Sequence, residues 1–562
     1  MINVKKFLEI ALLPSNNDTA WLERAESAVE YLVRNGQETE IILFSNVGQT
    51  YVNAVLIPQS NLNSETLEQL EYAHIEPMAQ WALDHVSGGG QPDRMYLSGP
   101  LQDRCQALNG GEQLIFRRHF TGVDKGPTRT ELSQQLVQAL DLYYMDEHNA
   151  YCRLDSHGDV KPIITLHDLS GLAAQPSAML VTIEAEQLNR YMAVTETALA
   201  VKFDFTRYRP NGGFSGWHEP ERGQHIGEHV RYHTGVEAGA SFANGVLIVR
   251  PVLTKEMMIA RHRRERDGTD KQYAIFKAHD WKNNQLAEVS CGPTALASYF
   301  DKDSPLPFQT TPAFFRPDVL LKYKSDSEKY TLDHRSISVR GGWYLKSYDV
   351  NEEGQVHAYL YDLANLPYSE QLYWQSFNEW PKAGISKRAY ETDFEGNFST
   401  MPDPLLDLKY EVAKLDKLAP DWWRPRGEAA VQAVHYPATA SSEEWSNAML
   451  ALDQLVVEGF VVKTIRAKLQ AQGRKPDVSW QSVRLLQEWL EQAGLDAEEA
   501  AATVEPLKRV HFLRSKTKGH LAETEKQALI KSAIKEHGSL AAHFRNLVAE
   551  VQNSFDRIIE KL

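Results

Sequence analysis

Residues 441–473 read SSEEWSNAMLALDQLVVEGFVVKTIRAKLQAQG. Two serines followed by two glutamates are a typical start of a helix, and the terminal Gly473 is a common residue just after one. Between these ends the apolar residues recur at the spacing of an amphipathic helix. We therefore predict one long helix here, with one face packed against a core.

Four more helical patterns follow this one. They read SWQSVRLLQEWLEQAG (479–494), DAEEAAATVEPLKRVHFLRS (496–515), ETEKQALIKSAIKEHG (523–538) and SLAAHFRNLVAEVQNSFDRIIEKL (539–562). Five helices with short connections predict a helical bundle. Several prolines between residues 400 and 426 indicate a domain boundary, so we assign the bundle to residues 425–562.

The rest of the chain is richer in strand signals. Residues 1–150 predict a mixed α/β domain, with helices over 19–35 and 64–86 and a strand–turn–strand over 40–58. Residues 151–415 predict a β-rich central region and possible sensor, with hairpins at 150–166 and 342–363. Its aromatic-dense segments, 311–324 and 366–380, predict core packing, with a binding surface as the alternative. The predicted fold class is α+β multidomain, ending in an all-α bundle.

Composition narrows the function classes. The 562 residues hold three widely spaced cysteines, which argues against a disulfide framework and favours a reducing compartment. No apolar run approaches a membrane span, so we expect a cytoplasmic protein without membrane partners. The net charge is −15, yet from residue 421 onward Lys+Arg and Asp+Glu are equal, at 19 each. Nucleic acid would therefore need a local basic site, because the first 420 residues carry the whole acidic excess.

Such a site lies at residues 506–522, PLKRVHFLRSKTKGHLA, which hold five Lys/Arg, two His and no acid. We predict that this stretch binds an RNA backbone. The predicted catalytic residues are Arg514 and His520. The predicted RNA-binding residues are Lys508, Arg509, Ser515, Lys516 and Lys518.

Arg514 and His520 have the chemistry for RNA cleavage. A histidine that titrates near neutral pH can take the proton of a ribose 2′-hydroxyl, and an arginine can hold the phosphate and offset its developing charge. We expect no metal or other cofactor. Six positions on a straight helix separate the two residues by roughly 120°, so a break at Gly519 or a second protomer has to bring them together.

A helical bundle with an Arg-x5-His element resembles the HEPN superfamily, over about residues 440–562. Many members are metal-independent ribonucleases of toxin and phage-defence systems, and others are not catalytic. The resemblance implies that Arg514 binds phosphate and that His520 is catalytic across a homodimer. Many members carry Asn directly after the Arg, where this chain has Ser515.

The resemblance implies an endoribonuclease of an abortive-infection type. RNA would be its substrate, and the large N-terminal region would sense a trigger, such as a phage protein, or regulate the nuclease. The alternative from another class is a non-catalytic scaffold, in which the aromatic centre binds a partner and the helical domain dimerises. Exposure of residues 508–520 separates the two.

A third class is hydrolase chemistry in the central region. His225, Glu228 and His229 match the His-x-x-Glu-His zinc pattern, although glycines flank them and a histidine-rich loop is the alternative. Cys291 begins a segment similar to the nucleophile region of papain-like peptidases, with His357 and Asp362 as conceivable partners. A buried, inert cysteine is the alternative there.

Overall fold

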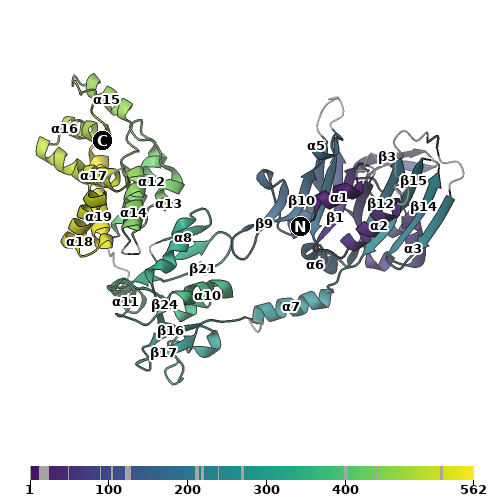
Figure 1. Ribbon diagram of the computed structural model, residues 1–562, viewed down its shortest axis with the longest axis horizontal. Coiled ribbons are helices and arrows are strands. Elements are labelled where there is room, and N and C mark those ends of the chain that lie inside the picture. The colour runs from purple at the N-terminus through teal and green to yellow at the C-terminus, as the bar shows by residue number, and fades with distance from the viewer. Residues whose placement is uncertain are drawn as a thin grey trace. The chain divides into compact units, whose positions relative to one another are not determined.

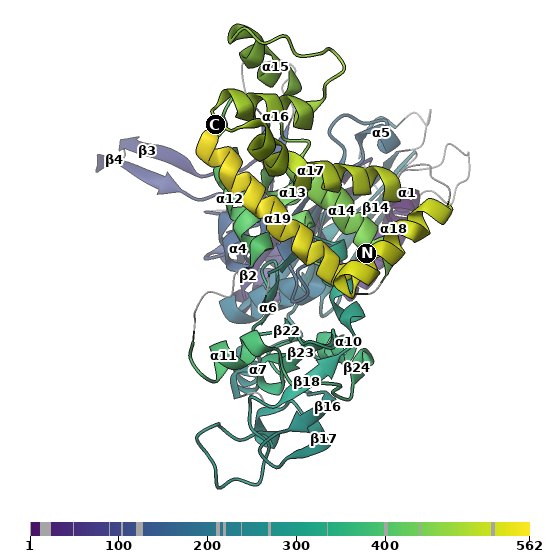
Figure 2. The same ribbon diagram turned by 90° about the vertical axis from the view of Figure 1, so that its left-hand side faces the viewer.

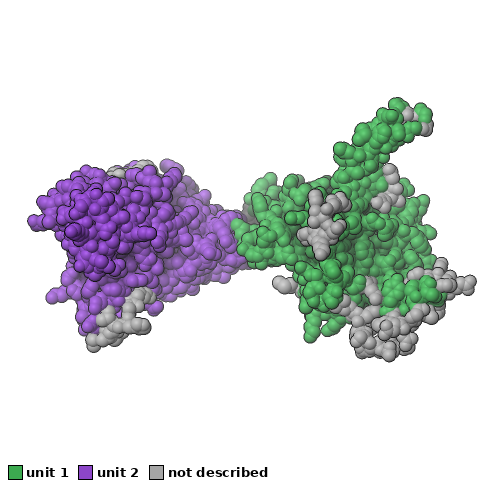
Figure 3. All heavy atoms as spheres, turned by 90° about the horizontal axis from the view of Figure 1, so that it is seen from above, with its two compact units in different colours: residues 1–154, 160–270 green, residues 155–159, 271–562 purple. Residues whose placement is uncertain are grey.

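The chain forms two compact units in the computed structural model (Figure 3). Residues 1–154 and 160–270 make the first, and residues 155–159 and 271–562 make the second. The structure describes residues 2–11, 24–48, 50–88, 90–102, 105–119, 128–208, 214–216, 221–237, 239–267, 271–333, 335–397, 403–437, 439, 441–518 and 523–562. Each unit is described by itself.

An antiparallel sheet of 11 strands dominates the described part of the first unit, in the order β13-β14-β15-β12-β2-β1-β11-β10-β9-β8, with β5 pairing β2 (Figure 1). The path strands are β1 Glu40–Val47, β2 Thr50–Pro58, β8 Tyr143–Met145, β9 Ala150–Leu154, β10 Val160–Asp168, β11 Met179–Glu184, β12 Thr197–Tyr208, β13 Glu221–Ile226, β14 Val230–Glu237 and β15 Ala240–Val249; the short β5 is Glu112–Gln113. Separate hairpins are β3 Ala82–Gly88 with β4 Gln91–Ser98, and β6 Ile115–Arg118 with β7 Arg129–Leu132.

Helices cover both faces of this sheet, because side chains alternate along each strand and both sets are apolar. Leu56 and Leu199 belong to the core that α1, α2 and α6 cover, whereas Val55 and Ala198 belong to the core beneath α3. The helices are α1 Val4–Ala11, α2 Arg24–Asn35, α3 Ser64–Tyr72, α4 Gln134–Ala139, α5 Ser170–Ala173, α6 Ala185–Thr195 and α7 Lys255–Asp267.

The predicted hairpins at 40–58 and 150–166 are confirmed by the pairs β1–β2 and β9–β10. The predicted helix over 64–86 is wrong beyond Tyr72, since residues 82–88 form β3. Pro77 disfavours any helix that continues through residues 76 and 77, because a proline disfavours helical backbone at the residue before it and lacks an N–H. The expected boundary at 150 lies inside one sheet, since β1 pairs with β11 and β2 with β12.

The central part of the second unit contains a six-stranded sheet, ordered β17-β16-β18-β23-β22 with β24 beside β18. Its strands are β16 Ile275–Asp280, β17 Gln285–Ser290, β18 Pro312–Phe315, β22 Asp349–Val350, β23 Val356–Tyr359 and β24 Asn378–Glu379. A second small sheet comprises β19 Tyr330–Leu332, β20 Ile337–Val339 and β21 Tyr344–Leu345. Four helices accompany them: α8 Leu321–Ser325, α9 Leu360–Leu363, α10 Tyr368–Ser376 and α11 Lys387–Asp393.

The hairpin predicted at 342–363 is confirmed in its inner part, where β22 pairs with β23. The aromatic-dense segment 366–380 forms α10 and the short strand β24. Its Trp374 is fully buried, with its ring 4.8 Å from the Phe315 ring in an edge contact. These aromatics pack the core, as expected for large apolar rings with a polar handle.

Helices make up the described part of the chain from residue 404 onward. They are α12 Pro404–Leu418, α13 Gly427–Ala433, α14 Ser442–Val456, α15 Val462–Ala471, α16 Ser482–Gln492, α17 Ala497–Lys518, α18 Glu523–His537 and α19 Leu540–Lys561. One apolar core joins these helices, and α19 runs along α12 and α17 (Figure 2). We call residues 404–562 the helical part. The α+β multidomain class, with an all-helical C-terminal region, is confirmed.

The helical part begins at Pro404, before the expected boundary at 425, because α12 buries Leu408 and Val412 in the same core. The single helix predicted over 441–473 is two helices, α14 and α15. Between them Gly459 lies under the Trp423 ring, and a Cβ there would overlap that ring. No helix in the described part of the chain is long and apolar enough to cross a membrane.

Gly459→Ala should destabilise the helical part by about 1–3 kcal/mol, the usual cost of overpacking a filled core. Urea denaturation followed by tryptophan fluorescence measures the loss. Gly384→Ala is the control, because a Cβ at that glycine meets open space. Equal stability of the two variants would show that Trp423 does not pack over this turn.

Candidate active site

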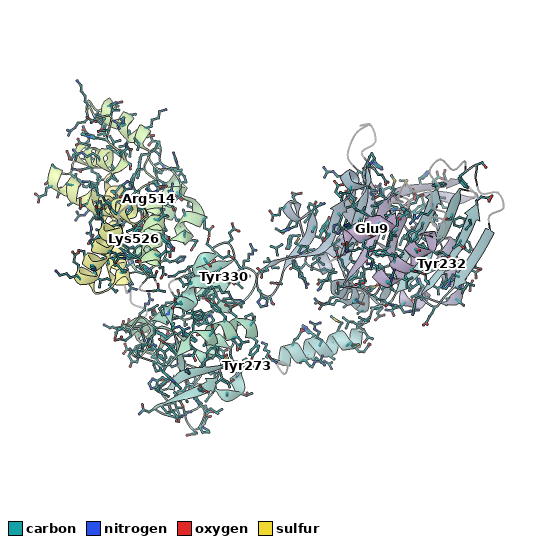
Figure 4. The ribbon with its side chains drawn as sticks, viewed as in Figure 1. Glu9, Tyr232, Tyr273, Tyr330, Arg514 and Lys526 are labelled. Carbon is teal, nitrogen blue, oxygen red and sulfur yellow. The ribbon has the colours of Figure 1, made fainter. Side chains whose placement is uncertain are left out.

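A buried carboxylate joins two helices of the helical part. Asp453 lies on α14 between the buried Leu452 and Leu455, and its side chain is fully buried. His511 and Arg514 stand three positions apart on α17, which places them on one side of that helix. Because α14 packs against α17, both side chains reach the same carboxylate. Figure 4 labels Arg514.

Five side chains, alternately basic and acidic, line this site. His511 Nδ1 lies 3.0 Å from Asp453 Oδ1, and Arg514 Nε lies 3.7 Å from Asp453 Oδ2. Arg514 Nη2 is 3.9 Å from Glu458 Oε1, while Arg426 Nη2 is 3.6 Å from Glu458 Oε2. The first contact is a hydrogen bond, and the other three are ion pairs longer than one. We call these five residues the charge chain.

Burial dominates the electrostatics of Asp453. Desolvation raises the pKa of its carboxyl, while the His511 hydrogen bond, the His511 charge and the Arg514 charge act to lower it. Its Oδ2 atom is buried and accepts no hydrogen bond from the described residues. In contrast, the His511 and Arg514 side chains are 53% and 36% exposed. A buried carboxylate therefore lies between two side chains that solvent or a ligand can reach.

Part of the predicted site lies outside the described residues. His520 and Gly519 do so, and nothing is described of the Lys518 side chain. The predicted meeting of Arg514 with His520 stays a prediction. Ser515 is described, and its hydroxyl donates to the Phe512 carbonyl oxygen at 2.7 Å.

The predicted RNA-binding cations contact neighbouring helices. Lys508 donates to Gln487 Oε1 of α16 at 3.1 Å, and Arg509 Nη1 lies 2.6 Å from Glu550 Oε2 of α19. Lys516 Nζ lies 3.7 Å from Glu525 Oε2 of α18. The stretch 506–522 has no acid of its own, but the fold brings acids to it from α18 and α19. A continuous bare basic strip over Lys508, Arg509 and Lys516 is therefore not formed.

Sequence reasoning assigned no role to four members of the charge chain: Arg426, Asp453, Glu458 and His511. One signal could have found Asp453. It is an acid amid the apolar ALDQLVVEG run, at a position where a helix buries its side chain, and buried acids are rare unless paired. Its partners are 58 and 61 positions further along the chain, so sequence spacing could not identify them.

The His-x-x-Glu-His residues lie on a hairpin. His225 is on β13, and its ring stacks 4.9 Å from that of Tyr232 on β14. His229 Nε2 lies 3.8 Å from Glu228 Oε1 in the turn. Two histidines on one helical face, which the zinc pattern requires, are absent from this hairpin. Within the described ranges, no group of three His, Cys, Asp or Glu is placed to hold a metal ion.

Cys291 is a buried thiol at the end of β17. Its Sγ contacts Gln371 Oε1 at 3.2 Å, and burial raises the pKa of the thiol to about 12. His357 lies on β23, three strands away, which is roughly 14 Å at the usual strand spacing. His357 Nε2 accepts a hydrogen bond from the Ser386 N–H and not from a thiol. The other conceivable partner, Asp362, lies on α9. The structure does not assemble a Cys–His pair here.

Comparisons with known proteins leave the family open. No protein-family model matches the chain, and no curated protein or solved structure matches it. The HEPN resemblance of residues 440–562 therefore rests on the helices and on the Arg514–His520 spacing.

Asp453→Asn should gain stability relative to the wild type as pH rises. Burial holds the folded pKa of Asp453 above its unfolded value, so the wild type loses stability when pH rises through the folded pKa, and Asn does not titrate. Urea denaturation at about pH 4 and about pH 7 compares the stabilities, because a raised Asp pKa is titrated above the ordinary Asp value.

Asp477→Asn is the matched control, with the opposite sign expected. The Ser479 hydroxyl and N–H lower the pKa of the exposed Asp477, so the wild type gains stability above the unfolded pKa and loses it as pH falls through the folded one. The variant should therefore lose stability relative to wild type as pH rises from about pH 2 to about pH 4, because this difference develops below the ordinary pKa of Asp. The same pH trend in both variants would contradict the burial of Asp453.

Native protein treated with iodoacetamide at neutral pH should leave Cys291 unmodified, because its thiol is buried and its pKa is about 12. The part-exposed Cys105 is the internal control for labelling, and urea-unfolded protein should be labelled at Cys291 as well. Peptide mass spectrometry reads both sites. Rapid native labelling of Cys291 would revive the thiol hypothesis.

Proposed function

We propose that the helical part is a metal-independent endoribonuclease. The observation that carries the proposal is the hydrogen bond between His511 and the buried Asp453, next to Arg514 on the same side of α17. A half-exposed histidine, oriented by a desolvated carboxylate and flanked by an arginine, combines proton transfer with phosphate binding. These are the two functions that cleavage next to a ribose 2′-hydroxyl needs.

In this mechanism Asp453 accepts a hydrogen bond from the His511 Nδ1–H and fixes the ring, which leaves the His511 Nε2 lone pair available. Nε2 takes the 2′-hydroxyl proton while the O2′ atom attacks phosphorus. The bond to the 5′-oxygen breaks, and a 2′,3′-cyclic phosphate forms. The Arg514 guanidinium offsets the charge that builds on the phosphate oxygens. Asp453 stabilises the imidazolium that results.

A second histidine would supply the proton that the departing 5′-oxygen needs. The HEPN resemblance assigns the catalytic role to His520, six positions after Arg514. Our proposal therefore assigns roles to two histidines that flank Arg514 in the sequence, with His511 as the base and His520 as the acid. Such a pair gives a rate that falls on both sides of an optimum pH.

We extend the proposal to the rest of the chain. The first 420 residues carry the whole acidic excess and are more than a nuclease needs, which fits a sensing or regulatory region. The protein would act in the cytoplasm as a homodimer through its helical part. It would belong to an abortive-infection type of antiviral system, with a phage protein as its trigger.

A non-catalytic scaffold remains the second candidate, and one observation favours it. Lys508, Arg509 and Lys516 all contact polar or acidic side chains of neighbouring helices. A network that ties a bundle together has this form. In that case the charge chain would hold α14 against α17 and process no substrate.

Cleavage of a labelled single-stranded RNA by the full-length protein in EDTA tests the proposal, with and without lysate from phage-infected cells. His511→Ala, Arg514→Ala and His520→Ala should each lower the rate by about 100-fold or more, the usual contribution of a proton-transfer group or a charge-stabilising donor. The products should carry 2′,3′-cyclic phosphates.

His262→Ala and Arg474→Ala are the matched controls, because both side chains are exposed and lie outside the charge chain. They should retain the wild-type rate. Dependence on a metal, or rates in His511→Ala and Arg514→Ala equal to wild type, would remove the proposal in favour of the scaffold. If His520→Ala loses cleavage and His511→Ala does not, the HEPN resemblance stays supported and the role proposed for His511 is wrong.

A further inference from the structure

We propose that Arg426 and Arg514 form a two-arginine clamp for a backbone phosphate of RNA, and that the Glu458 carboxylate occupies this clamp until the phosphate displaces it. The choice of RNA as the source of the phosphate rests on the proposed function. The clamp itself rests on the geometry around Glu458.

Glu458 lies in the turn after α14, and each of its carboxylate oxygens faces a different arginine. Oε1 is 3.9 Å from Arg514 Nη2, and Oε2 is 3.6 Å from Arg426 Nη2. Both distances exceed a hydrogen bond, so the carboxylate bridges the two guanidinium groups loosely. The Glu458 side chain is 44% exposed, whereas that of Arg426 is 14% exposed. Glu458 can therefore move toward solvent while the guanidinium of Arg426 stays in place.

One donor of the clamp lacks a hydrogen-bond partner. Arg426 Nε is buried and makes no hydrogen bond with the described residues. An arginine carries five N–H donors in a planar fork that matches a phosphate or carboxylate. A buried donor without an acceptor costs free energy, so this site is incomplete without a further acceptor. The two non-bridging oxygens of a backbone phosphate can accept from both guanidinium groups, which the Glu458 oxygens approach only to 3.6 and 3.9 Å.

The fold fixes Arg426 in place. Asp416 Oδ2 accepts the backbone N–H groups of Arg426, at 2.9 Å, and of Gly427, at 2.8 Å. Its other oxygen accepts the Trp423 indole N–H at 2.8 Å. Arg424 N–H donates to the Gly459 carbonyl at 2.8 Å, which pairs this loop with the turn that carries Glu458. One aspartate and one backbone bridge thus hold the arginine and the glutamate at the same place.

The charges explain why the Glu458 carboxylate occupies the clamp in the absence of a phosphate. Two guanidinium groups face two carboxylates, those of Asp453 and Glu458, so the clamp is neutral at rest apart from His511. A phosphate has to displace Glu458 to reach both arginines. Neutralising Glu458 leaves a surplus of one positive charge. Glu458 therefore lowers the affinity of the site, and Arg426 raises it.

Binding of a 2′-O-methyl RNA, which cannot be cleaved through its 2′-oxygen, separates the clamp from the catalysis. Fluorescence anisotropy with the full-length protein in EDTA gives the affinity. Glu458→Gln should tighten binding by about tenfold, and Arg426→Gln and Arg514→Gln should each weaken it by about tenfold, as expected for a charged hydrogen bond gained or lost. Arg426→Gln should also reduce the slope of log affinity against log salt by about 0.7.

Arg474→Gln and Glu498→Gln are matched controls, exposed and remote from the clamp in sequence, and should bind like the wild type. Circular dichroism and urea denaturation confirm that each variant folds, and Arg426→Lys keeps a charge if Arg426→Gln does not fold. Competition by inorganic phosphate distinguishes the sources. If phosphate displaces the RNA from wild type but not from Arg426→Gln, the clamp recognises the phosphate group itself.

Unchanged binding in folded Arg426→Gln, or weaker binding in Glu458→Gln, would overturn the clamp. The experiments distinguish failure of the clamp proposal from failure of the nuclease proposal. Binding that responds as expected, with no cleavage of ordinary RNA, keeps the clamp and removes the nuclease. Cleavage that depends on His511 and Arg514, with binding indifferent to Arg426 and Glu458, does the reverse.

Discussion

The carboxylate of Asp453 has to be satisfied inside the helical core, and the surrounding structure follows from that constraint. A buried charge is expensive unless partners within the fold compensate for it. Asp453 takes its hydrogen bond from His511 and a longer ion pair from Arg514, both on α17. These contacts and the buried apolar face of α17 agree on its rotation against α14, which places Arg514 beside Glu458. One buried acid thus aligns two helices and assembles a set of reactive side chains.

The same physics explains why the charge chain, and not the longer basic stretch, carries the functional proposals. Lys508, Arg509 and Lys516 contact polar or acidic side chains of α16, α19 and α18, so these cations stabilise neighbouring helices. Exposed ion pairs of this type contribute little free energy but lower the local positive potential. The ion pairs of Arg426 and Arg514 with Glu458 differ from these contacts. They are longer than hydrogen bonds and lie next to buried atoms that make none. A ligand gains most where the protein has left donors unused.

Prediction from sequence succeeded where the signal is local. The pairs β1–β2 and β9–β10 were predictable, because alternating apolar residues flank short turns. The end of α3 at Tyr72 was missed, because the helical pattern continues past it in the sequence and Pro77 marks a break only five positions later. The break at Gly459 was missed for a different reason. It depends on Trp423, a ring 36 positions earlier that packs over the glycine.

The sequence by itself determined the all-helical C-terminal region, the acidic excess of the first 420 residues and the presence of Arg514 in a basic stretch. Composition and short-range periodicity are sufficient for these. The tertiary structure decided that β1 and β11 share one sheet across residue 150, and that Asp453 meets His511. It also decided that Arg509 and Lys516 of the basic stretch pair with acids of α19 and α18. Contacts between distant segments depend on how whole helices and strands pack, and no local pattern encodes that packing.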